Sequence, residues 1–368
     1  MRWLFLFIVA VHGMIHFMGP AKAFGLADLP QLTVPISRGL GLAWLAAGVL
    51  VIAAAVTFVT WPRGWWMVGV AAAVLSQAVI VTSWTDVKAG TLANVLLLAG
   101  AVYGLAAAGP GSFRAAYERD AADVLARPVA AAAVTEGDLQ PLPAPVQRYL
   151  REVGVVGQPR MENYRLRFRG RIRSGPAARW MPFTVEQTSA APTATRLFLM
   201  RATLFGVPIH GYHRLAAGHA TMHVKALGLV TVAQAAGPEM DQAETVTLFN
   251  DMCLLAPASL LSPSVTWEAI DDRSARGWLT HSGHRISAVL TFGDDGLITD
   301  FVSDDRLALG ADGRSFSRWR FSTPVKEYRQ YGPYRLAGRV EALWHAPAGA
   351  YAYGEFELLD AQFNVGRP

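Results

Sequence analysis

Two histidines stand four residues apart in the first apolar stretch of this chain of 368 residues. At that spacing His12 and His16 share one face of a helix, and imidazoles paired in this way can ligate haem or a transition metal. Ionisable side chains inside a membrane are costly to leave unpaired, so they mark candidate functional sites. The alternative is that both rings are neutral and hydrogen-bonded to neighbours such as Ser76, Gln77 or Asp86. Because the other apolar stretches contain no histidine, we favour this alternative and expect no cofactor.

Adjacent polar residues form a second candidate set. Asp304 and Asp305 precede Arg306 at the end of a predicted strand, and Asn250 and Asp251 lie together in an apolar helical segment. Paired carboxylates could perform acid–base catalysis if one of them were desolvated, whereas a strand end held by salt bridges is the alternative. An amide and a carboxylate in an apolar helix need partners. We expect Asn250 and Asp251 to lie at the mouth of a cavity and to orient the head group of an apolar ligand.

The remaining reactive residue types carry weaker signals. Cys253 is the only cysteine, and a cysteine on an apolar helix face is usually an inert buried thiol. His219 and His223 could share a strand face, but their neighbours are unlike a zinc site. No P-loop, GxGxxG, GxSxG or HExxH motif is present, so we lean against an enzyme. The residues that we predict to bind ligand are Asn250, Asp251, Phe249, Cys253, His210, His213, Asp304, Asp305, Arg306, Trp319 and Trp344.

The helix that must position the central residues of this set is predicted for residues 238–256. Pro238 suits the first helical position, and Val246, Phe249 and Cys253 recur at helical spacing on a wide apolar stripe. The segments before and after this helix alternate with period two and are separated by turn sequences. Consecutive antiparallel strands with one central helix predict an α+β domain, in which a curved antiparallel sheet or half-barrel surrounds the inserted helix.

One predicted strand is unusual in charge. In residues 162–173 (ENYRLRFRGRIR), apolar residues alternate with arginine, so that one face is apolar and the other basic. This row could hold anionic lipid head groups. The alternative is a solvated outer face whose charges pair with acids on neighbouring strands. The arginines of the row are Arg165, Arg167, Arg169, Arg171 and Arg173.

The first part of the chain is far more apolar than the rest. Four runs are long enough for a bilayer core, which needs about 20 residues per helix, and tryptophans lie at their ends, where aromatic belts belong. The runs are Trp3–Gly19, Leu40–Thr60, Trp65–Trp84 and Thr91–Ala108. The first also resembles a signal peptide, but we favour a retained helix. We therefore predict a four-span membrane domain at 1–109, a juxtamembrane helical linker at 110–137 and the β-rich domain at 138–368.

Charge gives only a slight indication of sidedness and excludes one class of partner. The net charge is +5, but the excess is shared between the two halves, which is unlike a nucleic-acid-binding domain. Basic residues are slightly more frequent on the side of the membrane that carries Arg2 and Arg63. We therefore expect a multi-pass protein of the cell membrane, with the large domain in the cytoplasm.

Several segments resemble an uncharacterised bacterial family of membrane-anchored proteins. They are HGMIHFMGPAKAFGL, NDMCLLAPASLL, VSDDR, STPVKEY and LWHAPAGAYAYGEFELLDAQFNV. The strand-rich domain is also similar in outline to the lipoprotein-carrier (LolA-like) half-barrels. That resemblance implies acyl chains held between a curved sheet and helices, although a fold does not fix a function.

These patterns favour a membrane-tethered binding module for a lipid or another hydrophobic small molecule. Two alternatives remain open. The first is an enzyme that acts on a membrane-derived substrate through carboxylates near Asp251 and Asp304. The second is a metal or redox membrane protein centred on His12 and His16.

Overall fold

The computed structural model describes residues 2–126, 132–310, 312–313 and 315–366. The chain divides into two compact units, Met1–Ala116 and Tyr117–Pro368.

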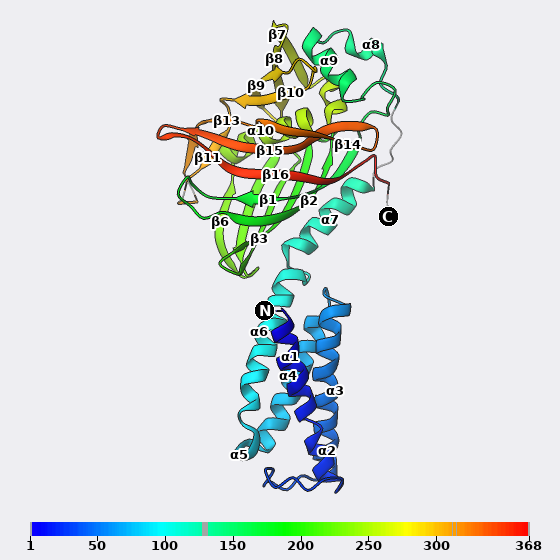
Figure 1. The fold of residues 1–368 in the computed structure, drawn as a ribbon, viewed down its shortest axis with the longest axis vertical. Helices are drawn as coiled ribbons and strands as arrows, with labels where there is room; N and C mark the ends of the chain where they lie inside the picture. Colours follow the sequence, from blue (N-terminus) through cyan, green and yellow to red (C-terminus); the bar gives the residue numbers. More distant parts are fainter. Residues whose placement is uncertain (1, 127–131, 311, 314, 367–368) are drawn as a thin grey trace. The chain divides into compact units, whose positions relative to one another are not determined.

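The first unit is a helical bundle (Figure 1). Within the described residues, four helical segments are long and apolar enough to cross a membrane: Arg2–Ala23, Arg38–Thr60, Trp65–Thr82 and Gly90–Leu125. The individual helices are α1 (Arg2–Ile15), α2 (Met18–Ala23), α3 (Arg38–Thr60), α4 (Trp65–Thr82), α5 (Trp84–Val87), α6 (Gly90–Ala108) and α7 (Phe113–Leu125), the last of which crosses the boundary between the units. The four predicted apolar runs are confirmed.

Small residues allow the helices of the bundle to pack closely. A Cβ atom at Gly19 would lie 2.2 Å from the Trp44 ring, and one at Gly48 would lie 3.0 Å from the carbonyl oxygen of Gly13. Glycine at these positions lets α1 and α2 lie directly against α3, the close approach that membrane helices use in place of hydrophobic association. Asp86 organises the loop before α3, because its carboxylate accepts hydrogen bonds from Thr33 Oγ1 at 2.7 Å and from the Val34 amide at 2.8 Å.

The second unit contains the strands that the structure describes, β1 to β16, and the central helix. Its helices are α8 (Glu136–Leu139), α9 (Ala144–Glu152), α10 (Pro238–Leu254) and the 3-10 helix η1 (Pro257–Leu261). Its strands before α10 are β1 (Asn163–Ile172), β2 (Met181–Ala190), β3 (Thr195–Leu204), β4 (Val207–Ala216), β5 (His219–Ala226) and β6 (Val230–Ala236). Those after it are β7 (Val265–Asp271), β8 (Ser274–His281), β9 (His284–Phe292), β10 (Ile298–Ser303), β11 (Leu307–Leu309), β12 (Phe316–Arg318), β13 (Arg320–Ser322), β14 (Val325–Tyr331), β15 (Tyr334–Ala346) and β16 (Gly349–Phe363).

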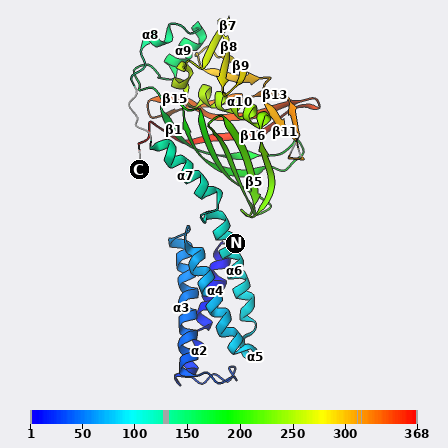
Figure 2. The same ribbon diagram turned by 180° about the vertical axis from the view of Figure 1, so that it is seen from behind.

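One open antiparallel sheet forms most of this unit. Its order is β6-β5-β4-β3-β2-β1-β16-β15-β13-β10-β9-β8-β7, with β14 paired to β15 and with β11 and β12 forming a separate ladder. Helix α10 contacts β5 and β6 on one wing of the sheet and β8, β9 and β10 on the other. It therefore lies within the curve of the sheet (Figures 1 and 2). The predicted fold class, a membrane helix bundle followed by a half-barrel around an inserted helix, is confirmed.

The core of the half-barrel surrounds α10. Val246, Phe249 and Cys253 are fully buried on this helix, as their spacing predicts. Tyr149 of α9 donates a hydrogen bond from its hydroxyl to the carbonyl oxygen of Cys253. This contact satisfies one of the carbonyls left without a helical partner at the end of α10.

Two local features differ from the sequence pattern. The pattern does not predict β4, in which Pro208 and Gly211 interrupt the apolar alternation, or the short strands β11 and β12. The predicted helix 238–256 ends two residues early, at Leu254. The next proline, Pro257, begins η1 instead, because proline disfavours helical backbone at the residue before it.

Candidate functional site

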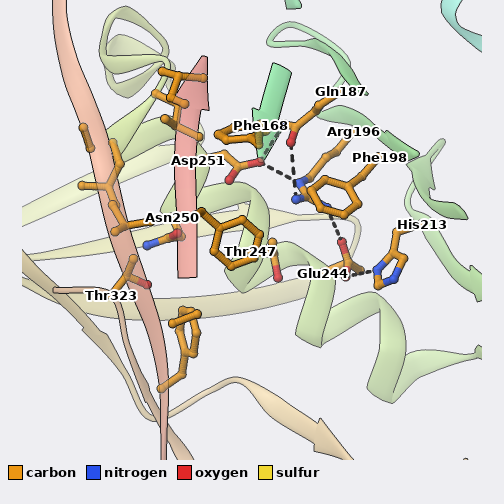
Figure 3. A pocket seen from close by; sticks show the side chains of 18 of the residues that line it. Phe168, Gln187, Arg196, Phe198, His213, Glu244, Thr247, Asn250, Asp251 and Thr323 are labelled. Atoms are coloured by element: carbon orange, nitrogen blue, oxygen red, sulfur yellow. Dashed lines mark hydrogen bonds and ion pairs between the residues drawn. The ribbon is translucent and has the colours of Figure 1, made fainter. Parts of the chain in front are cut away.

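The candidate site is a cavity of about 140 Å³ between one face of α10 and the concave side of the sheet (Figure 3). Most of its wall is apolar, because inward-facing residues alternate along each strand and α10 adds Leu254 and Leu255. The aromatic and aliphatic lining includes Phe168, Phe198, Met200, Phe321, Phe356 and Leu358. Polar side chains lie beside this lining in two groups. The groups differ in whether their polar atoms have hydrogen-bond partners.

The first polar group is a buried ionic network. Arg196 of β3 places Nε 2.6 Å from Oδ2 of Asp251 and Nη1 3.1 Å from Oε2 of Glu244. Gln187 of β2 donates from Nε2 to the same oxygen of Asp251 at 2.8 Å. Nδ1 of His213 lies 3.4 Å from Oε1 of Glu244. Glu244 and Asp251 are seven positions apart, so two turns of α10 present both carboxylates to the same arginine (Figure 3).

The ionic side chains of this network remain charged although they are deeply buried. Arg196, Glu244 and Asp251 have relative exposures of 5%, 4% and 6%. Burial alone would raise the pKa of Glu244, but the hydrogen bond to His213 and the charge of Arg196 outweigh it and lower that pKa to about 2. Burial opposes the charge of Arg196, yet the two carboxylates raise its pKa above the usual arginine value. Such a triad is rigid and strongly coupled, because each member would be costly to leave without the others.

The second polar group surrounds Arg306, which lies between β10 and β11. Its guanidinium carbon lies 4.2 Å from the ring centre of Phe321, 5.0 Å from that of Trp344 and 5.7 Å from that of Tyr353. Nη1 of Arg306 also donates to the Tyr353 hydroxyl. Three aromatic faces therefore hold this cation by cation–π attraction.

The structure brings only some of the predicted binding residues to the cavity. Asn250, Asp251, His213 and Arg306 line it. Phe249 and Cys253 belong to the core on the other side of α10, where Phe249 contacts Trp267 and Phe301. Burial, followed by the charge of Asp251, raises the pKa of the Cys253 thiol, which keeps it protonated.

The other predicted residues lie outside the lining. His210 is buried in β4, and Trp344 stacks on Tyr353 behind the cavity wall, with Trp319 against it. Asp304 forms an exposed ion pair with Arg320 at 2.8 Å. Asp305 accepts from the Ser287 amide at 2.8 Å and from the Ser287 hydroxyl at 3.1 Å. The two aspartates thus serve different contacts and do not form a paired carboxylate site.

The sequence did not lead us to predict five polar residues of the site: Gln187, Arg196, Glu244, Thr247 and Thr323. Arg196 carried a usable signal, because it is a charged residue in the otherwise apolar strand segment TRLFLM. A buried charge needs a partner, and Asp251 has the same requirement on the helix. Gln187 carried no comparable signal, because its neighbours in β2 are themselves mixed in polarity.

The row of arginines on β1 faces away from the cavity and is largely neutralised by the last strand. Arg167 pairs with Asp360 at 3.5 Å, Arg169 with Glu357 at 2.7 Å and Arg171 with Glu355 at 2.5 Å. Arg165 is exposed on the same face, and Arg173 follows the strand and donates to the Ala352 carbonyl. This arrangement favours the solvated, acid-paired face over a surface dedicated to anionic lipids.

The histidines of the first unit belong to a buried hydrogen-bond network. Nε2 of His12 lies 2.9 Å from Asn94 Oδ1 and 3.1 Å from Ser76 Oγ, and Nε2 of His16 lies 2.9 Å from the same Ser76 oxygen. Of the three proposed partners, Ser76 contacts both rings. Gln77 joins indirectly by accepting from Asn94 at 3.0 Å. Asp86 binds the loop before α3 instead, so its proposed role with the histidines is wrong. Among the residues that the structure describes, no group of three or more His, Cys, Asp or Glu side chains could hold a metal ion.

We expect the His12→Ala variant to lose stability without losing metal. The change removes the partner of the buried Asn94 oxygen, and a buried polar group without a partner costs about 1–3 kcal/mol. Thermal unfolding in detergent, together with elemental analysis of the wild-type protein, checks this expectation. Stoichiometric copper, iron or haem that is present in the wild type and absent from His12→Ala would contradict it.

A comparison with models of protein families shows which family the chain belongs to. Residues 132–356 match the model described as "Family of unknown function (DUF6544)". The chain belongs to this family. The expected membership of a family without an established activity is thereby confirmed, and the match spans most of the half-barrel of this DUF6544 protein.

Other comparisons were made with curated proteins and with solved structures. No curated protein matches the chain. A crystal structure of a candidate outer membrane lipoprotein-sorting protein domain from Vibrio parahaemolyticus aligns with 10% identity and a TM-score of 0.35, covering 55% of this chain and 86% of that one. A DUF1329 family protein from Desulfovibrio piger aligns with 10% identity and a TM-score of 0.35, covering 61% of this chain and 94% of that one. At this level of similarity, the functional argument rests on the cavity itself.

Proposed function

We propose that this DUF6544 protein is a membrane-tethered binding module whose half-barrel accepts a lipid or another hydrophobic ligand. The observation that carries the proposal is the apolar cavity between α10 and the concave sheet. Apolar walls with a few placed polar groups are the usual composition of a small-molecule site. The four apolar helices of the same chain add support, because a chain anchored in a membrane has access to hydrophobic ligands.

The size of the cavity limits what it can hold. An engineered apolar cavity of about 150 Å³ binds benzene, whereas drug-sized ligands occupy pockets of about 300–1,000 Å³. A cavity of about 140 Å³ therefore has room for one slim apolar group, such as part of a single acyl chain. A bulkier ligand would have to displace side chains at the edge of the cavity.

We favour binding over catalysis because the carboxylates of Asp251 and Asp304 already take part in ion pairs. Asp251 is fixed by Arg196 and Gln187, and Asp304 lies outside the cavity in an exposed ion pair. A general base needs a free lone pair within reach of the proton that it removes. Asp304 is out of reach of a molecule in the cavity, and Oδ2 of Asp251 already accepts from Arg196 and Gln187.

Filling the cavity tests the proposal directly. Ala342 of β15 is buried and lines the cavity, so Ala342→Leu should occupy space that a ligand needs. We expect hydrophobic molecules that co-purify with the wild-type protein, identified by mass spectrometry after extraction, to fall at least about tenfold in this variant, a change equivalent to about 1.4 kcal/mol.

The matched control is Ala350→Leu, which makes the same change at an exposed position of β16. Its ligand content should equal that of the wild type. Equal ligand content in Ala342→Leu, with an unchanged melting temperature, would place the bound molecules elsewhere and contradict the proposal.

We also propose that the half-barrel lies in the cytoplasm. An even number of spans returns the chain to the side of Arg2, and basic residues are slightly more frequent on that side. A reporter enzyme fused after Pro368 checks this placement. Alkaline phosphatase activity from the fusion, which requires export, would reverse it.

A further inference from the structure

Three polar atoms of the cavity lining have no hydrogen-bond partner among the described residues. They are Nδ2 of Asn250, Nε of Arg306 and Oγ1 of Thr323. Each atom is buried, and Thr323 as a whole is only 2% exposed. Figure 3 shows Asn250 and Thr323 on the side of the cavity away from the Arg196 network. The cavity thus has one polar group that is joined by ion pairs and another that carries unpartnered donors.

The unpaired atoms share one chemical property. The amide nitrogen of Asn250 and Nε of Arg306 are hydrogen-bond donors only, and the hydroxyl of Thr323 can also donate. They come from three separate elements: α10, the segment between β10 and β11, and the residue that follows β13. Three donors that converge on one cavity from different parts of the chain call for an acceptor.

The charges around the cavity indicate which kind of hydrogen-bond acceptor the unpaired donors would bind. Both arginines line the cavity, but Arg196 has two carboxylates within ion-pair distance, whereas Arg306 has none within the described ranges. The contacts that hold Arg306 are aromatic faces and the Tyr353 hydroxyl, none of which neutralises it. Glu244 is influenced by the charge of Arg306, but its oxygens are bonded to Arg196 and His213. A guanidinium held in this way is suited to an anionic oxygen group.

Energetics explain why the arrangement indicates a ligand. A buried donor without a partner costs about as much as a lost hydrogen bond, so native proteins keep few of them. Three such donors on one cavity wall are retained at the expense of stability. Binding sites commonly sacrifice stability in this way, because the groups are satisfied only in the complex.

We propose that Asn250, Arg306 and Thr323 bind the carboxylate or phosphate head group of a single-chain amphiphile whose tail lies along the apolar wall. This inference rests on the proposed function and adds the chemistry of the ligand to it. The head group accepts from the three donors, and the paired network of Arg196 closes the opposite polar side of the cavity without contributing free donors.

The test compares ligands that share one tail and differ in the head. Decanoate, decyl phosphate, decanol and decyltrimethylammonium are titrated calorimetrically into the full chain in lipid nanodiscs, and the heats from empty nanodiscs are subtracted. Inorganic phosphate alone serves as a probe without a tail. The proposal predicts that decanoate and decyl phosphate bind at least about tenfold more tightly than decanol, and that the cationic probe and inorganic phosphate bind more weakly still.

Variants link this preference to the named donors. Arg306→Gln should remove most of the preference for an anionic head. Thr323→Val keeps the shape but deletes an unpartnered hydroxyl, so it should weaken decanoate binding about threefold to tenfold and leave the ligand-free protein equally or more stable. Thr245→Val is the matched control. Thr245 is a buried threonine of α10 outside the cavity, and its hydroxyl donates to the Asp241 carbonyl at 2.7 Å. The control should lose stability without any change in head-group preference.

The possible failures are distinguishable. Equal affinity for decanol and decanoate, unchanged in Thr323→Val, would overturn the head-group assignment and leave hydrophobic binding intact. Inorganic phosphate that binds as tightly as decyl phosphate would assign the donors to a soluble anion and overturn the amphiphile. No binding of any probe, combined with no effect of Ala342→Leu on co-purified ligand, would overturn the proposed function itself.

Discussion

The Arg196→Met variant should lose about 3–5 kcal/mol of unfolding free energy at neutral pH, the cost typical of breaking a buried ion pair from one side. Methionine keeps much of the length of arginine but leaves Glu244 and Asp251 buried without their shared cation. Urea unfolding of the detergent-solubilised protein, followed by tryptophan fluorescence, measures the loss.

The unfolding free energy lost in Arg196→Met should depend on pH in a defined direction. In the wild type, the pKa of Glu244 is lowered from its ordinary value of 4.5 to about 2. Its charged form therefore adds stability above pH 4.5, and this contribution is lost as the pH falls from 4.5 toward 2. Without Arg196, burial favours the protonated form of Glu244. The difference between variant and wild type should therefore be largest at neutral pH and should shrink as the pH falls through about 4.5.

The matched control is Arg201→Met on the same strand. Arg201 is exposed and pairs with the partly exposed Glu186 at 3.5 Å, and surface pairs contribute about 0–1 kcal/mol. A loss in Arg196→Met no greater than that in the control, or a deficit that does not change with pH, would contradict a stabilising role for the buried network.

The Phe249→Ala variant should destabilise the half-barrel by about 3–5 kcal/mol while leaving the ligand selectivity of the cavity unchanged. The ring is fully buried between Trp267 and Phe301, at centroid distances of 6.1 Å and 5.8 Å. Its removal leaves a void on the side of α10 that does not face the cavity. The same urea titration measures the stability, and the decanoate and decanol titrations measure the selectivity.

Phe249→Leu is the control for volume, and it should recover most of the lost stability because a smaller void remains. Asp251→Asn is the contrasting variant for ligand binding, because it removes a charge from the cavity wall and keeps the shape of the side chain. If Phe249→Ala altered the preference for decanoate as much as Arg306→Gln, the division of α10 into a structural face and a binding face would be wrong.

The sequence predicts the regular elements well because their signals are local. Four apolar runs of about 20 residues can be recognised without any tertiary information. The predicted span Leu40–Thr60 differs from α3 only at its first residues. Strand β1 is equally clear, since arginine and apolar residues alternate over 162–173. The apolar stripe of α10 likewise follows from helical spacing alone. Strand β4 fails by the same reasoning, because Pro208 and Gly211 remove the alternation that a local pattern needs.

The site is predicted only in part because its partners come from distant segments. Asn250 and Asp251 stand out as polar residues on an apolar helix, and both line the cavity. That Arg196 binds Asp251 depends on the pairing of β3 within the sheet, which a single sequence does not specify. The carboxylates of Asp304 and Asp305 are neighbours in sequence, but both residues lie in the loop between β10 and β11, where Asp304 pairs with Arg320 and Asp305 accepts from Ser287. Adjacency in the chain therefore does not bring the two carboxylates together at one site.

The pairing of β1 with β16 has a consequence for how the chain folds. This pairing joins the first strand of the sheet to the last, and the amide of Glu162 donates to the side chain of Asn364, 202 positions away. Strands β1 to β6 follow one another as hairpins and need only local contacts, so they can form early during synthesis. The β1 edge, however, stays open until β16 has been synthesised and has left the ribosome. Contacts of such long sequence separation slow folding, so joining the two wings of the half-barrel is a late event. Until then the wall that β16 supplies to the cavity is missing, so a nascent chain without β16 has no complete cavity for a ligand.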